Sequence, residues 1–165
     1  AEQTEKVWAS KLGLKKFHLT LFQDLLELMH TSEVDYTMFF RELSNIPNDF
    51  TALSKAFYSA PSEKLIDKWK VWLSEWRKQV SQEDDFARIS TQMKKVNPKY
   101  TWREWLIIPA YENAANGDYT LLKELQEVFR HPYDEQTTEF ENKYYRLRPK
   151  ELFGVGGVAF YSCSS

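Results

Sequence analysis

Cysteine is nearly absent, since Cys163 is the only one among 165 residues. A single thiol can form no intrachain disulfide and no thiolate-rich metal site, so any disulfide must reach a cysteine outside this sequence. Histidine is also scarce. His18, His30 and His131 match no pair of metal ligands on one helix turn, and no HExxH motif occurs, so metal catalysis is not expected.

The sequence has neither a strong charge imbalance nor a long apolar run. Lys and Arg number 22 against 24 Asp and Glu, a formal charge of -2, which gives no broad attraction to polyanions. No apolar run approaches the roughly 20 residues that cross a bilayer, and no basic segment precedes an apolar one at the N-terminus. We therefore expect neither nucleic acid nor membrane as a partner. Ala1 opens directly on an amphipathic helical pattern without an initiator Met, which is typical of a fragment.

Familiar catalytic motifs are missing too. There is no GxSxG, no P-loop and no HRD or DFG string. The glycines of residues 154–157 lack the strand and helix that flank a phosphate loop, which favours a hinge. A few oxygen-bearing side chains faintly resemble the ligands of a calcium loop: Thr31, Glu33, Asp35 and Glu42. Tyr36, however, stands where such a loop needs glycine. The residues alone predict no catalytic apparatus.

Helical periodicity is the main pattern that is present. Apolar side chains recur at three- and four-residue spacing over residues 18–31 and 61–80, with Pro61 suited to a first helical turn. Further helices are expected over residues 83–95, 101–116 and 119–130. Two pairs have the spacing of capping boxes, Ser81 with Asp84 and Thr101 with Glu104. Asn116-Gly117 can form the left-handed turn that ends one helix, and Asp118 can cap the next. Pro109 should kink its helix or shift its boundary.

Tryptophan is abundant, and most of it follows the helical period. The stripe in residues 61–80 contains Trp69, Trp72 and Trp76. Stacking on bases or sugars is one interpretation, but an aromatic stripe at this period favours a core or a helix–helix interface.

The fold class predicted from these patterns is all-α, because no segment alternates with period two between turn residues. We expect an irregular helical bundle over residues 1–132 and an extended tail over residues 133–165. The tail is too aromatic for a free solvated end, so it should dock on a larger body. Its Cys163 is either an incidental thiol or, if exposed, one able to exchange with a second thiol.

Several segments resemble the SelO family of kinase-like protein adenylyltransferases. Residues 35–37 and 40–44 read DYT and FRELS, similar to the family's DYTxxFRxLS. Residues 97–118 are similar to its NPxxxLRNWLAxxAIEAAExGD, residues 131–133 to a short Pro-containing turn, and residues 162–165 to its C-terminal Ser-Cys-Ser-Ser. Departures are Glu104 in place of Asn, Pro109 in a normally unbroken helix, and glycines where a Pro-Pro-x-Trp string is common.

The resemblance implies a parent protein that transfers AMP from ATP to Ser, Thr or Tyr of proteins, with Mg²⁺ or Mn²⁺. It places the ATP, metal and catalytic residues upstream, so this segment is expected to contribute none of them and to be inactive alone. It also implies that Cys163 is a redox-regulatory thiol that forms a disulfide with a cysteine of the kinase-like domain. The parent would be cytoplasmic in bacteria and mitochondrial in animals or fungi. The partners implied are that upstream domain and the parent's protein substrates. The alternative to an adenylyltransferase part is a non-enzymatic helical interaction module, whose Trp stripe binds a partner helix.

Overall fold

A computed structural model describes residues 2–81 and 85–153 of the chain. The chain divides into two compact units, Ala1–Pro98 and Lys99–Ser165. This division lies upstream of the boundary at residue 132 that was expected from the sequence. Within the described residues the elements are helical, as predicted, and the only strand-like feature there is an isolated bridge between Val34 and Phe57.

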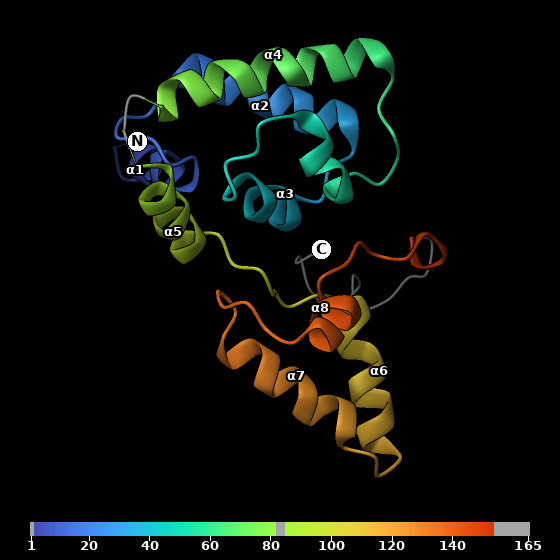
Figure 1. Ribbon diagram of the computed structural model, residues 1–165. Coiled ribbons are helices and arrows are strands. Elements are labelled where there is room, and N and C mark those ends of the chain that lie inside the picture. Colours follow the sequence, from blue (N-terminus) through green and yellow to red (C-terminus); the bar gives the residue numbers. More distant parts are fainter. Residues whose placement is uncertain (1, 82–84, 154–165) are drawn as a thin grey trace. The chain divides into compact units, whose positions relative to one another are not determined.

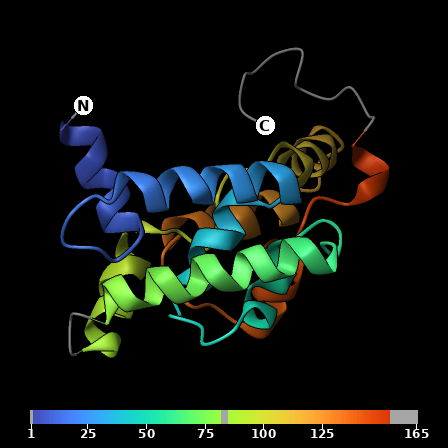
Figure 2. The ribbon, with the colours of Figure 1, turned by 90° about the horizontal axis from the view of Figure 1, so that it is seen from above.

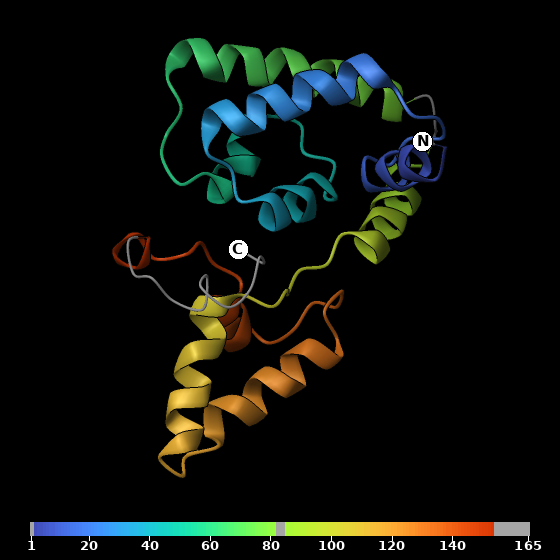
Figure 3. The same ribbon diagram turned by 180° about the vertical axis from the view of Figure 1, so that it is seen from behind.

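The first unit is built on two long helices that run side by side (Figures 1 and 2). These are α2 (Leu19–Ser32) and α4 (Glu63–Val80), which confirm the helices expected over residues 18–31 and 61–80. A short helix α3 (Tyr36–Leu43) and the 3-10 helix η1 (Phe50–Ala56) pack together beneath them. Helices α1 (Glu2–Lys11) and α5 (Phe86–Val96) form a second pair, seen from behind in Figure 3.

The tryptophan stripe of α4 is core. Trp69, Trp72 and Trp76 are buried, and each indole N–H donates to an oxygen of a preceding segment. The acceptors are Ser32 Oγ at 2.8 Å and the carbonyls of Leu21 and Leu12, each at 2.9 Å. Large rings with satisfied N–H groups contribute much of the buried area of a small unit. The stripe is therefore unavailable for stacking on a base or for binding a partner helix.

Two of the expected helix starts are corrected. Ser81 ends α4 instead of capping the next helix, and α5 begins after Asp85, whose carboxylate accepts from the amide of Arg88 at 2.9 Å. Asp84 lies outside the described residues. Pro61 lies before the N-cap Ser62 and not in the first turn of α4. A Ser or Thr three residues before an acidic residue is a common pattern, and a nearby Asp competes for the same amides.

The second unit contains a helix pair, α6 (Glu104–Ala115) and α7 (Thr120–Arg130), joined by a tight turn (Figure 1). Gly117 adopts a φ of 87°, which confirms the left-handed turn expected there. Asp118 was expected to cap the next helix, but the N-cap of α7 is Tyr119; Asp118 Oδ1 accepts from the amide of Thr120 at 3.0 Å from one position before the cap. Thr101 does not cap α6, whose N-cap is Arg103 without a side-chain hydrogen bond. Pro109 lies inside α6 without ending it.

The expected extended tail contains a helix. α8 (Thr138–Tyr144) is capped by Thr137, whose hydroxyl accepts from the amide of Phe140 at 3.2 Å, and a single 3-10 turn η2 (Lys150–Leu152) follows. The polar stretch concealed this helix because only Phe140 and Tyr144, four residues apart, mark its apolar face. Tyr144 and Tyr145 are buried; the Tyr144 hydroxyl donates to Glu124, and the ring centroid of Tyr145 lies 6.3 Å from that of Tyr100.

Candidate functional site

The residues shared with the family motifs meet at the end of α5. The guanidinium of Arg41, on α3, is buried, and its Nη1 donates to the carbonyls of Lys94 at 3.3 Å and Asn97 at 3.2 Å. The last carbonyls of a helix have no partner within the helix. Arg41 therefore closes the C-terminus of α5 from a neighbouring element and places a positive charge at its negative end.

Asn97 is the centre of this arrangement and is fully buried. Its side-chain amide donates to the Ser44 hydroxyl at 3.0 Å and to the carbonyl of Lys11 at 2.9 Å, while its Oδ1 accepts from Lys11 Nζ at 2.8 Å. The Ser44 hydroxyl in turn donates to the carbonyl of Phe40 at 2.7 Å. We call Lys11, Arg41, Ser44 and Asn97 the polar hub; it connects α1, α3 and α5.

The ammonium of Lys11 also lies over two aromatic rings. Its Nζ is 4.8 Å from the ring centroid of Phe40 and 5.4 Å from that of Tyr36. Burial lowers the pKa of Lys11, and burial raises the pKa of Tyr36 to about 12. The rings and Asn97 offset the loss of hydration of a cation that is partly removed from water.

The acidic residues of the first motif are engaged in the fold. Asp35 caps α3 by accepting from the amide of Met38 at 2.9 Å, and Tyr58 donates to its second oxygen at 3.3 Å. Glu42 pairs with Lys55 at 3.2 Å. Throughout residues 2–81 and 85–153, no three His, Cys, Asp or Glu side chains are grouped to hold a metal ion.

In the second unit Lys99, like Lys11 in the first, is a cation held by polar and aromatic partners. Its side chain is buried, with Nζ bonded to Glu135 and 3.0 Å from Glu141, and it lies 4.9 Å from the ring centroid of Tyr145. Burial lowers the pKa of Lys99, but the hydrogen bonds to Glu135 and Glu141 outweigh it, so the pKa is raised. The amides of Lys99 and Tyr100 donate to the Pro132 carbonyl at 2.8 and 3.1 Å, which ties the motif to the turn of residues 131–133.

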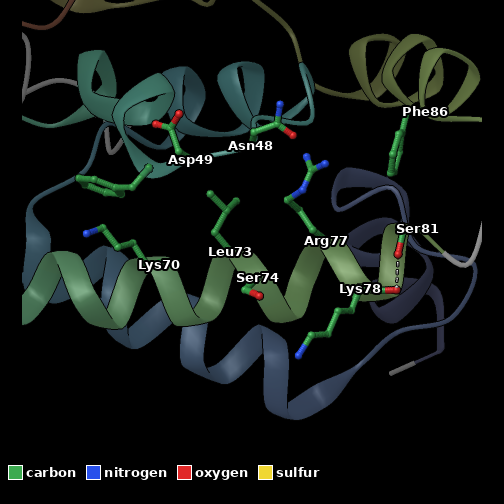
Figure 4. Close-up of a pocket in the computed structure, with 10 residues that line it drawn as sticks. Asn48, Asp49, Lys70, Leu73, Ser74, Arg77, Lys78, Ser81 and Phe86 are labelled. Carbon is green, nitrogen blue, oxygen red and sulfur yellow. Dashed lines mark hydrogen bonds between the residues drawn. The ribbon is translucent and has the colours of Figure 1, made fainter.

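A pocket in the first unit lies between the start of η1 and one face of α4, with a volume of about 570 Å³ (Figure 4). Its lining combines basic, acidic, polar, aliphatic and aromatic side chains, among them Lys70, Arg77, Asp49, Ser74, Leu73 and Phe86. The sequence did not indicate this pocket, because its walls come from segments without a shared motif.

Comparison with known proteins identifies the family. Residues 2–130 match the family described as protein adenylyltransferase SelO. The chain belongs to the SelO family. The relatives it matches include proteins named protein nucleotidyltransferase YdiU from Aromatoleum aromaticum (34% identical over 174 residues) and Vibrio parahaemolyticus (33% over 181 residues). The alignments cover 99% and 100% of this chain but 32% and 34% of the relatives, so the chain spans about a third of their length.

The SelO motifs in this chain are thus mainly structural. Residues 35–44 supply the cap of α3 and two members of the polar hub, and residues 97–99 supply Asn97 and Lys99. The sequence located these residues through the resemblance to the SelO family, but it did not indicate that they are buried. Lys11, which lies 86 residues from its partner Asn97, belongs to no motif quoted above.

Cys163, the one functional residue expected for this SelO chain, lies outside the described residues, as do the glycines of residues 154–157. A separate finding concerns the membrane: none of the described helices has the length and apolar character that a membrane span requires.

Proposed function

We propose that this chain is the helical C-terminal part of a SelO-type protein adenylyltransferase, and that it supports a kinase-like catalytic core located elsewhere in the same polypeptide. The observation that carries the proposal is the polar hub. Residues of the family motifs face inward and bond to backbone carbonyls of this chain, with Arg41 and Asn97 both buried. Groups held in this way build a scaffold and do not contact a substrate.

ATP and Mg²⁺ or Mn²⁺ belong to the proposed parent. The described residues do not fit these groups, because phosphoryl transfer requires acidic metal ligands and cations directed at phosphates. Asp35 caps a helix, Glu42 pairs with Lys55, and Lys99 is enclosed by two glutamates. In this proposal the described residues take part in no catalytic step. In the parent, transfer of AMP to Ser, Thr or Tyr hydroxyls of proteins would depend on the rest of the polypeptide.

The proposal is tested by comparing the chain with a longer SelO protein that contains it. Both are incubated with ATP labelled in the α-phosphate, a divalent cation and acceptor proteins. We expect AMP incorporation by the longer protein and none by the 165-residue chain. Incorporation by the chain alone would contradict the proposal that the catalytic core lies elsewhere in the polypeptide.

Asn97→Ala in the longer protein should lower its stability more than its activity per folded molecule, since the hub is structural.

We further propose that Cys163 is a regulatory thiol. Together with a cysteine of the catalytic core it would lose two protons and two electrons to a disulfide oxidant such as oxidised glutathione, which is released as two thiols. The scarcity of cysteine supports this proposal, because Cys163 has no possible partner in this sequence.

The redox proposal is tested with Cys163→Ser in the longer protein. Oxidation of the unmodified protein should change its mobility in a non-reducing gel and alter its activity, and a thiol reductant should reverse both changes. The variant should show neither. If the variant responds to oxidant and reductant as the unmodified protein does, Cys163 is not the regulatory thiol.

A further inference from the structure

The pocket beside α4 has a cation toward each end of one helix face. Lys70 and Arg77 both line it and are seven residues apart, which places them on one face and about 10 Å apart along the axis. Figure 4 shows the guanidinium of Arg77 directed from α4 toward Asn48, whereas Lys78 points to the other side of the helix. Lys78 is paired there with Glu75, and Lys70 lies 3.8 Å from Asp67. Arg77 is therefore the main cation that faces the pocket.

Arg77 is held in position by the loop that precedes η1. Its Nη1 donates to the carbonyls of Ile46 at 2.7 Å and Pro47 at 2.8 Å. Ile46 has a φ of 50°, a left-handed conformation that is unfavourable for a β-branched residue. Both bonds use one nitrogen of a group with five N–H donors, and among the described residues no acceptor is assigned to Nε or Nη2. A guanidinium fixed before binding loses little entropy when an anion arrives.

The walls next to Arg77 are flat and apolar. The ring of Phe86 is half-exposed, and the Cζ of Arg77 lies 5.4 Å from its centroid. Leu73 forms part of the floor, and the Ser74 hydroxyl and Asn48 amide supply further donors. A volume of about 570 Å³ suits a compound with one small ring.

The far wall contains one opposing charge. Asp49 accepts from the hydroxyl and, at 2.7 Å, the amide of Thr51, and these bonds hold the pKa of Asp49 below its usual range. A bound anion is therefore repelled from the Asp49 side and favoured at Arg77, and a ligand with a single anionic group fits better than a polyanion.

We propose that this pocket binds a small aromatic oxyanion, whose carboxylate or phosphate pairs with Arg77 while its ring packs against Leu73 and Phe86. The proposal is independent of AMP transfer, since the proposed catalytic core lies elsewhere in the polypeptide and the pocket is lined by residues of this chain alone. Neither the family match nor the motifs assign a ligand to these positions.

The test uses the full chain, labelled with ¹⁵N, and three probes: phenyl phosphate, inorganic phosphate for the anion alone, and benzyl alcohol for the ring alone. Phenyl phosphate should cause saturable shifts of the amides of Ser74, Arg77 and Phe86, and should bind at least about tenfold more tightly than either partial probe. Shifts that do not saturate, or equal binding of phenyl phosphate and inorganic phosphate, would show an adventitious anion contact and overturn the proposal.

Variants locate the binding. Arg77→Lys should weaken phenyl phosphate binding about tenfold, because a lysine cannot form the paired hydrogen bonds of a guanidinium. Phe86→Leu and Lys70→Gln should weaken it about threefold each, and they avoid the structural bonds of Arg77 should that variant unfold. Lys64→Gln is the matched control, because Lys64 lies on α4 but does not line the pocket. Unchanged affinity in both Phe86→Leu and Lys70→Gln would refute the assignment.

Discussion

Lys11 and Asn97 bond to each other twice, in opposite directions. The ammonium of Lys11 donates to the Asn97 side-chain oxygen at 2.8 Å, and the Asn97 side-chain amide donates to the Lys11 carbonyl at 2.9 Å. The two residues are 86 positions apart, at the ends of α1 and α5. This reciprocal pair joins the first helix of the unit to its last. Arg41 and Ser44, from the SelO motif of residues 35–44, both bond to Asn97.

Replacing the centre of the polar hub should therefore destabilise the first unit. Asn97→Ala removes three hydrogen bonds and takes away the donor that Asn97 supplies to the Lys11 carbonyl and to the Ser44 oxygen, so we expect a loss of about 3 kcal/mol in the free energy of unfolding. Urea unfolding followed by circular dichroism measures it. Asn45→Ala, at an exposed position of the same unit, should change stability by less than about 0.5 kcal/mol. Equal effects of the two substitutions would show that the hub contributes nothing.

Arg41 should be sensitive even to the conservative exchange. Arg41→Lys keeps the charge but cannot reach the carbonyls of Lys94 and Asn97 together, and should cost about 1 to 2 kcal/mol. The same urea experiment applies. Arg88→Lys, at an exposed position of α5, serves as the control and should be nearly neutral. A loss confined to charge-removing variants such as Arg41→Met would mean that the charge, and not the geometry, closes the end of α5.

The helices that the sequence predicted well are those with long apolar stripes, α2 and α4. The short helix α8 was missed because two aromatic residues four positions apart are too few to establish a period. The caps at Ser81 and Thr101 were wrong because a local pattern cannot tell which of several side chains reaches the free amides. The role of Asn97 could not be predicted, since its partners Lys11 and Ser44 are distant in sequence and only the fold brings them together.

Gly13 should tolerate substitution less well than Gly117, although both adopt a positive φ, 68° and 87°. A Cβ at Gly13 would lie 2.6 Å from Met93 Sδ and 2.9 Å from Ile89 Cγ2, two buried side chains of α5, whereas a Cβ at Gly117 meets nothing within 4 Å. Gly117→Ala should thus cost about 1 kcal/mol from the backbone alone, and Gly13→Ala about 1 to 3 kcal/mol more from the added overlap. Urea unfolding of both variants gives the difference. Similar losses would mean that α1 and α5 separate easily enough to accept a methyl group.

The contact between α7 and α8 should weaken in acid. Glu124 accepts from Lys143 and, at 2.6 Å, from the Tyr144 hydroxyl, and these hydrogen bonds hold the pKa of Glu124 below its ordinary value. A carboxylate with a depressed folded-state pKa contributes stability above its unfolded pKa of about 4.3, and that contribution disappears as the pH falls through the folded value. Hydrogen-exchange protection factors for the amides of α8 should therefore fall below about pH 4.3.

Glu124→Gln separates this carboxylate from the general effect of acid. The amide can still accept from Tyr144, but it does not titrate, so protection of α8 should be lower at neutral pH and should lose most of its dependence on acid. Glu127→Gln is the matched control on the same helix, where the exposed carboxylate pairs only with Arg130 among the described residues, and it should keep the acid response of the unmodified chain. If Glu124→Gln retained that response as well, the acid-sensitive group would have to be a carboxylate other than the one that bonds Tyr144.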